Sequence, residues 1–191
     1  MSLPTLILAS ASPRRAELLS QLDFPFQVLA SNVPEVEDDH LSPFEVCQLN
    51  AHRKARAVAK KHPDAVVLGA DTLVFLGRDV LGKPANTAEA EKMLKRLQGK
   101  THQVVTGLSL IQMRSHRESV FAESTDVRFR SLTPDQISHY LAQINPLDKA
   151  GAYAIQDHGE LIVEEVSGSF TNVVGLPLER LEAELNRWKK L

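Results

Sequence analysis

The feature that most constrains the fold is a nearly continuous apolar run from Ala65 to Leu76, which carries one acidic residue, Asp71. A run of this composition predicts a strand that is buried on both faces, as in a sheet covered by helices. Aspartate is rare in strands and costly to bury without a partner. Asp71 is therefore interpreted either as a functional carboxylate or as a structural one that caps a nearby helix. The functional roles are a general base for water and a ligand for a hard cation such as Mg²⁺.

Segments typical of strands and of helices alternate along the whole chain. Capping residues and prolines predict helices that start at Ser12-Pro13, Ser42-Pro43, Thr87, Thr133-Pro134 and Pro177. Apolar and alternating patterns predict strands over residues 6–9, 65–76, 104–113, 119–129 and 161–166. The sequence has no repeat, low-complexity tract or Gly/Ser linker. This order predicts a mixed α/β protein in which residues 1–191 form one domain with two lobes and no separable linker.

Composition and charge exclude several classes of protein. A hydrophobic fraction of 43% is enough for a core, whereas a net charge of -2 gives no basic field for a nucleic-acid backbone. Cys47 is the sole cysteine, which excludes an internal disulfide and a thiolate metal cage and fits a reducing compartment. No apolar run approaches the roughly 20 residues that span a bilayer. We expect a cytoplasmic protein that binds a small anion, and neither nucleic acid nor a membrane.

Two arginines, Arg14 and Arg15, fall in the first turn of the first predicted helix. A helix N-terminus is electropositive and has unpaired N–H groups, so cations are disfavoured there unless an anion binds. One interpretation is a polyphosphate site that the two guanidinium groups form together with the hydroxyls of Ser10 and Ser12. The alternative is that both arginines face solvent or pair with the Asp38-Asp39 region.

Lys54 interrupts the apolar stripe of the helix that is predicted from Ser42 to about Lys61. Its amine must either extend outward or pair with an anion, because an unpaired buried charge costs several kcal/mol. We favour pairing with a phosphate. The acidic loop before this helix offers oxygen ligands for Mg²⁺, although most such loops are simply solvated; the candidates are Glu35, Glu37 and Asp38.

Two later segments carry candidate ligand-binding residues. Lys83 lies in the rigid turn Gly82-Lys83-Pro84, and taken alone it is interpreted as an ordinary turn lysine. Residues 148–156 are rich in small side chains, which permits a ligand to approach the backbone. Gln156 either donates to and accepts from a base edge or is a surface amide. The sequence has no P-loop, and its histidines and serines favour neither a zinc site nor a catalytic triad.

Five segments taken together, in this order, resemble the Maf family of nucleotide pyrophosphatases. They are Leu8 to Arg15, Gly69-Ala70-Asp71-Thr72, Gly82-Lys83-Pro84, Asp148 to Gln156 and Val174 to Leu178. The resemblance runs nearly end to end. It implies the Maf/Ham1 (ITPase-like) fold, an elongated, curved mixed β-sheet flanked by helices, with two lobes around a nucleotide cleft. It also implies a divalent metal cofactor, Mg²⁺ or Mn²⁺, and a cytoplasmic homodimer.

The resemblance also assigns residues by position. Asp71 becomes the group that activates water and, together with Glu37, a metal ligand. The phosphate environment comprises Ser10, Arg15, Lys54 and Lys83. The residues with the identities of the branch acting on dTTP and UTP, and not of the branch acting on 7-methyl-GTP, are Arg14, Thr72 and Gln156. The chain departs from the branch pattern at Ala154 and Asp157, where glycine is usual.

The resemblance therefore implies hydrolysis of dTTP and UTP, and of modified pyrimidine nucleotides, to the monophosphate and pyrophosphate, which keeps these nucleotides out of nucleic acids. Two alternatives stay open. One is the same chemistry on a modified purine triphosphate such as 7-methyl-GTP. The other is a non-catalytic nucleotide sensor that regulates cell division, which would bind triphosphate without releasing pyrophosphate.

Overall fold

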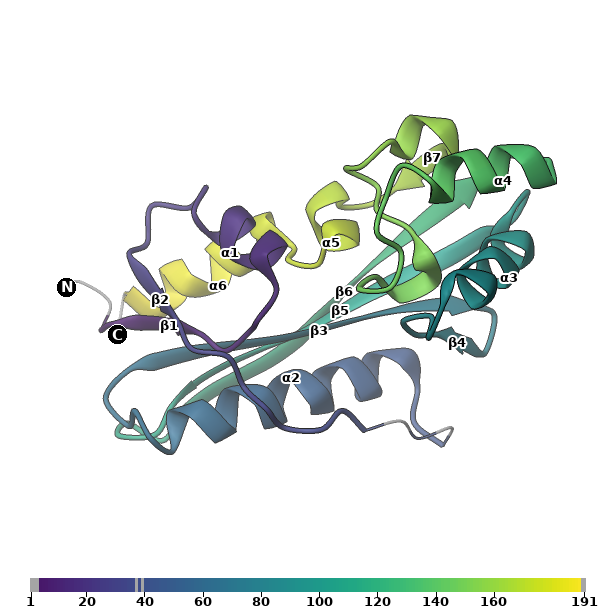
Figure 1. Cartoon of the computed structure of the whole chain (residues 1–191). Coiled ribbons are helices and arrows are strands. Elements are labelled where there is room, and N and C mark those ends of the chain that lie inside the picture. The colour runs from purple at the N-terminus through teal and green to yellow at the C-terminus, as the bar shows by residue number, and fades with distance from the viewer. Residues whose placement is uncertain (1–3, 37, 39, 190–191) are drawn as a thin grey trace. The chain divides into compact units, whose positions relative to one another are not determined.

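The computed structural model describes residues 4–36, 38 and 40–189, which form alternating strands and helices (Figure 1). The strands are β1 (Leu6–Leu8), β2 (Phe26–Val28), β3 (Val66–Leu76), β4 (Asp79–Leu81), β5 (Thr101–Gln112), β6 (Arg117–Phe129) and β7 (Val163–Ser167). The α-helices are α1 (Pro13–Leu19), α2 (Pro43–Ala59), α3 (Thr87–Leu97), α4 (Pro134–Leu141), α5 (Phe170–Val174) and α6 (Leu178–Lys189). Two short 3-10 helices are η1 (Ala150–Ala152) and η2 (Gly159–Leu161).

The strands form a seven-stranded mixed sheet in the order β2-β1-β3-β5-β6-β7, and β4 pairs with β3. β1 is parallel to β2 and β3, whereas β4 is antiparallel to β3 and β7 to β6. The prediction of a mixed α/β protein is confirmed. The sequence pattern does not predict β2 or α5, which are short and, unlike the equally short β1, are not an unbroken apolar run.

The sequence predicts Thr87 as the N-cap of the third helix, and this assignment was wrong by one residue. The side chain of Asn86, and not that of Thr87, caps α3 by accepting a hydrogen bond from Glu89 N at 2.9 Å. Thr87 is the first residue of the helix itself. Both residue types are good N-caps, so the sequence alone did not separate them.

The chain folds into two compact units. The first comprises residues 1–71, 106–123 and 175–191, and the second comprises residues 72–105 and 124–174. Each unit has an apolar core of its own. A nucleotide cleft between two lobes stays a prediction. Among the described residues, no helix has both the length and the apolar character needed to cross a membrane.

In the first unit, α2 covers one face of the strands, and α1 and α6 cover the other face (Figure 1). The predicted start of α2 is confirmed as a capping box. The Ser42 side chain accepts from Glu45 N at 3.3 Å, and the Glu45 side chain accepts from Ser42 N at 2.8 Å. The apolar side of α2 packs on the strands through small side chains, including Ala55 and Ala59.

Two glycines let α2 come unusually close to the strands. A Cβ atom at Gly69 of β3 would lie 2.2 Å from Ala51 O, and a Cβ atom at Gly107 of β5 would lie 2.3 Å from the carbonyl carbon and oxygen of Cys47. Any larger residue would therefore push the helix away. Gly69 lies two residues before Asp71 in β3, so this close contact brings the middle of α2 next to that carboxylate.

The second unit has its own core, in which α3 packs against α4 and η1. A cluster of rings lies within it. His102 meets Phe129 edge-on with ring centroids 4.8 Å apart, and Tyr153 edge-on at 5.4 Å. His102 Nε2 is 2.9 Å from the Tyr153 hydroxyl.

Burial of His102 makes the second unit sensitive to acid. It lowers the pKa of His102 from 6.5 to about 4. Between these values the unfolded chain binds a proton that the folded protein does not, so the free energy of unfolding falls as pH falls, by about 3 kcal/mol for this group. We therefore expect the difference in unfolding free energy between pH 7.5 and pH 4, measured by urea denaturation, to be smaller in His102→Gln than in the wild type by about 3 kcal/mol. The control is His40→Gln, which removes an exposed histidine. An unchanged pH dependence in His102→Gln would contradict the assignment.

Candidate active site

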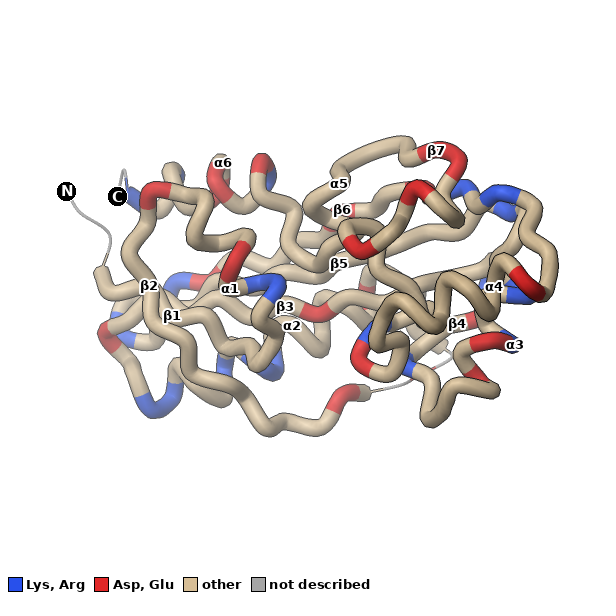
Figure 2. Tube along the Cα trace, turned by 45° about the horizontal axis from the view of Figure 1, so that its top comes forward, with Lys and Arg blue, Asp and Glu red and all other residues tan. Residues whose placement is uncertain are grey.

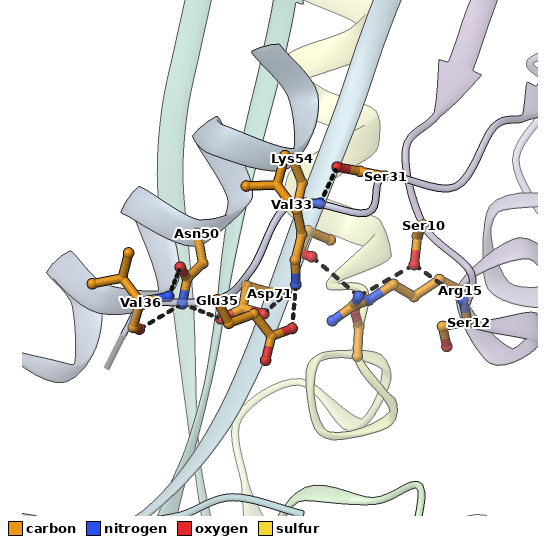
Figure 3. A network of polar contacts seen from close by, with 12 residues as sticks. Ser10, Ser12, Arg15, Ser31, Val33, Glu35, Val36, Asn50, Lys54 and Asp71 are labelled. Atoms are coloured by element: carbon orange, nitrogen blue, oxygen red, sulfur yellow. Dashed lines mark hydrogen bonds and ion pairs between the residues drawn. The ribbon is translucent and has the colours of Figure 1, made fainter. Parts of the chain in front are cut away.

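Asp71 lies in β3 with 3% of its surface exposed, so the predicted carboxylate in a buried strand is confirmed. Its Oδ1 accepts a hydrogen bond from Lys54 Nζ at 2.6 Å, and its Oδ2 accepts one from Asn50 Nδ2 at 3.2 Å (Figure 3). Both donors lie in the middle of α2, one helical turn apart. These partners are side chains and not the N–H groups of a helix terminus, so the contacts do not correspond to a helix cap.

Lys54 joins Asp71 to a second carboxylate. Its Nζ atom is 2.6 Å from Glu35 Oε1 and 2.6 Å from Asp71 Oδ1, and its side chain is 13% exposed. Of the two outcomes predicted for a lysine on an apolar stripe, the structure has pairing with anions, but here the anions are protein carboxylates. Figure 2 shows basic residues in α1 and α2, the helices that supply Arg15 and Lys54.

The environment of Asp71 raises the pKa of its carboxyl above the ordinary value. Burial is the main cause, and the Glu35 charge acts in the same direction, whereas the charge and hydrogen bond of Lys54 and the charge of Arg15 oppose the rise. A carboxylate with a raised pKa is a stronger base than a solvated one. Asp71 therefore has the character needed to accept a proton from water.

Arg15 makes hydrogen bonds to three segments of the first unit. Its Nε donates to Gly175 O at 2.9 Å, and its Nη1 donates to Ala70 O at 3.1 Å and to Ser10 Oγ at 3.3 Å. Ser10 is itself buried, and its Oγ also accepts from Ser12 N at 3.2 Å (Figure 3). Because Ala70 precedes Asp71, these bonds place a guanidinium group beside the strand at the level of the carboxylate.

The N-terminus of α1 keeps features of the predicted anion site. Ser12 is the N-cap, but its side chain makes no capping hydrogen bond. Arg14 is half-buried in the first turn, which carries no acidic residue. Burial lowers the pKa of Arg15, and the charges of Asp71 and Glu35 oppose this shift. Arg14 and Arg15 as phosphate ligands stay a prediction.

Sequence reasoning missed Asn50. This residue is 2% exposed and contacts both Asp71 and the backbone of Val36. A signal was available, because Asn50 precedes Lys54 by four residues and so lies on the same face of the helix. The sequence predicts Glu35 either as a metal ligand or as a solvated loop residue, whereas the structure pairs it with Lys54.

Three predicted substrate-binding residues, Thr72, Lys83 and Gln156, belong to the second unit. Thr72 continues β3, and Lys83 follows β4. Gln156 is exposed and directly follows residues 151–155, all of which are buried. This exposure leaves both interpretations of Gln156, a base contact and a surface amide, in place.

The segment before Gln156 tolerates alanine where the branch pattern has glycine. Ala154 is not among the described residues with positive φ, whereas Ala152 has φ 63°. The Tyr140 hydroxyl donates to Ala154 O at 3.1 Å and accepts from Ala154 N at 3.0 Å. The backbone two residues before Gln156 is therefore held by a buried side chain.

Of the two predicted metal ligands, Asp71 and Glu37, only Asp71 is among the described residues. Glu37 lies outside the described residues. Within the described residues, no group of three or more His, Cys, Asp or Glu side chains is placed to hold a metal ion. Asp71 and Glu35 do present two carboxylate oxygens to one cation, the Lys54 amine. Mg²⁺ is commonly bound by one or two carboxylates together with substrate phosphates and water, so this pair fits a metal that arrives with a polyphosphate.

Comparison with known proteins gives consistent matches along the chain. The family model described as "Maf-like protein" matches residues 5–188. A protein of Symbiobacterium thermophilum named dTTP/UTP pyrophosphatase is 51% identical over 178 residues, which cover 92% of this chain and 89% of that protein. One of the same name from Bacillus mycoides is 46% identical over 183 residues, covering 96% of this chain and 95% of the relative. A HAM1 protein structure from Coxiella burnetii matches with TM-score 0.45 and 16% identity over 66% of this chain and 73% of that chain.

Proposed function

Because the chain belongs to the Maf family, we propose that it is a nucleoside triphosphate pyrophosphatase that hydrolyses dTTP and UTP to the monophosphate and pyrophosphate. The observation that carries the proposal is the buried Asp71 carboxylate held by Lys54, with Arg15 beside the same strand. A basic carboxylate among cations suits hydrolysis of a polyanion. The names of the relatives supply the substrate class.

In the proposed mechanism, Asp71 accepts a proton from a water molecule whose oxygen attacks the α-phosphorus. The new bond joins that oxygen to the α-phosphorus, and the bond from the α-phosphorus to the bridging oxygen breaks. Pyrophosphate leaves with the bonding electrons. Lys54 and Arg15 neutralise charge that develops on the phosphoryl oxygens, with Arg14 and Ser10 as further donors. Each Asp71 oxygen has a second acceptor site, so the contacts with Lys54 and Asn50 leave room for the water proton.

A divalent metal, Mg²⁺ or Mn²⁺, is part of the proposal, and Asp71 with Glu35 or Glu37 would hold it. Such an ion supplies charge neutralisation on the triphosphate when bound. The protein groups act on the rest of the reaction: Asp71 takes the proton, and the cationic side chains orient the phosphates.

Assignments in the second unit rest on the family resemblance alone. Thr72 and Gln156 would select a pyrimidine through hydrogen bonds that a purine cannot complete, and Lys83 would contact a phosphate. A cytoplasmic homodimer belongs to the same proposal. Cys47 is buried and is the single cysteine of the sequence, so no internal disulfide can form, which is compatible with a reducing compartment.

The proposal is tested by a substrate panel of dTTP, UTP, CTP and 7-methyl-GTP with Mg²⁺ or Mn²⁺. We expect pyrophosphate release from dTTP and UTP with kcat/KM at least about 10-fold above that for 7-methyl-GTP, since a binding site that pairs with one base edge leaves polar groups unpaired with another. Preference for 7-methyl-GTP would indicate instead that the substrate is a modified purine triphosphate. Tight binding of triphosphates without pyrophosphate release would indicate a nucleotide sensor.

A further inference from the structure

Asn50 occupies a position in the first unit that the chemistry above does not explain. It lies in the middle of α2, and 2% of its surface is exposed. Its Oδ1 accepts a hydrogen bond from Val36 N at 2.8 Å. Its Nδ2 donates to Val36 O at 3.1 Å and to Asp71 Oδ2 at 3.2 Å (Figure 3). One side chain thus contacts a loop backbone and the proposed general base together.

The backbone of Val36 fixes which way the Asn50 amide faces. An N–H group needs an acceptor, so the amide oxygen of Asn50 must face Val36 N, and its nitrogen is then left to face the two acceptors, Val36 O and Asp71 Oδ2. The nitrogen has two hydrogens, one for Val36 O and one for Asp71 Oδ2. Asp71 therefore receives a donor whose orientation the loop determines.

The hydrogen bonds of Asn50 and Lys54 hold both Asp71 and the loop that carries Glu35. Lys54 binds Asp71 Oδ1 and Asn50 binds Asp71 Oδ2, so the two oxygens are each fixed by a donor from α2. Val36 follows Glu35, whose carboxylate contacts Lys54. Asn50 and Lys54 thus connect the loop to Asp71 by two independent routes.

We propose that Asn50 is a positioning residue that holds the Asp71 carboxylate and the acidic loop at Val36 in one fixed arrangement for catalysis. This inference rests on the proposed function, because it assigns Asn50 a role through Asp71. Asn50 acts on the orientation of the base and not on the binding of phosphate. Its loss should therefore lower kcat more than it changes KM.

Two variants separate the amide donor from packing and from charge. Asn50→Asp has nearly the same shape and leaves no cavity but, as an ionised carboxylate, cannot donate, whereas Asn50→Ala adds no charge. An effect that both variants share arises from the lost donor. We expect kcat for dTTP to fall about 10- to 100-fold in both, the range typical of residues that orient a reactive group, with KM within about 3-fold.

Hydrogen exchange gives a readout that does not depend on turnover. The Val36 amide is protected by the Asn50 oxygen, so Asn50→Ala should accelerate its exchange. Asn50→Asp keeps an acceptor at this place and should retain more protection. Equal exchange in the wild type and in Asn50→Ala would overturn the proposed link to the loop.

Val58→Ala is the control for general destabilisation, because Val58 is a buried apolar residue of the same helix. It should lower the free energy of unfolding while kcat stays within about 2-fold, as expected of a core truncation away from the site. If kcat in both Asn50 variants also stays within that range, Asn50 is structural and the inference fails. If the wild type itself does not hydrolyse triphosphates, the proposed function fails instead.

Discussion

Asp71→Asn is expected to lower kcat for dTTP by about 10³-fold, because the amide cannot accept a proton from the attacking water. The fold should persist, since asparagine is nearly isosteric and its oxygen can still accept from Lys54. The measurement is single-turnover release of pyrophosphate at saturating dTTP, with cooperative thermal unfolding as the check on structure.

The control for this substitution is Asp64→Asn in the same unit. Asp64 is an exposed carboxylate that pairs with Arg114 at 2.7 Å. The Asp64→Asn variant should keep the wild-type kcat, because a surface ion pair contributes little to stability and Asp64 is not part of the site. Full activity in Asp71→Asn would rule out Asp71 as the general base.

Lys54→Met is expected to damage both stability and activity. It leaves Asp71 buried without its nearest cation and leaves Glu35 as a like charge nearby, and breaking a buried ion pair in this way costs about 3 kcal/mol of unfolding free energy. It also removes positive charge from the proposed transition state, which should lower kcat about 10²-fold. Urea denaturation and steady-state kinetics measure the two effects. Lys61→Met, which removes an exposed lysine, is the control.

A double variant tests whether Lys54 acts on stability through Asp71. In Lys54→Met with Asp71→Asn, no ionised group is left buried in the strand. The double variant should therefore be more stable than Lys54→Met alone, giving a coupling free energy between the two positions. Strictly additive losses would show that the ion pair does not account for the damage.

The elements that sequence predicts best are those with strong local signals. The capping box at Ser42 and Glu45 and the apolar run from Ala65 to Leu76 are enough to identify α2 and β3. The polar residue within each apolar pattern then identifies Lys54 and Asp71, and their pairing at 2.6 Å is the consequence. Local patterns suffice to single out these residues because a charge on an apolar face must either reach solvent or find a partner.

Contacts between distant segments are what the sequence does not give. The bond from Arg15 to Gly175 joins residues far apart in the chain, and no local pattern specifies it. The spacing of four residues between Asn50 and Lys54 is only a weak sequence signal, because an asparagine in a helix is ordinarily a solvated polar residue. The burial of Asn50 follows from Gly69, which lets α2 approach β3 within a distance that a Cβ atom would forbid. Such a close contact is a property of the packed structure.

Hydrolysis of dTTP in ¹⁸O-labelled water tests most directly the central claim that a water molecule attacks the α-phosphorus. Mass spectrometry of the products locates the new oxygen. The proposed mechanism predicts the label in the nucleoside monophosphate and none in pyrophosphate. Label in pyrophosphate, or release of orthophosphate as the first product, would contradict it.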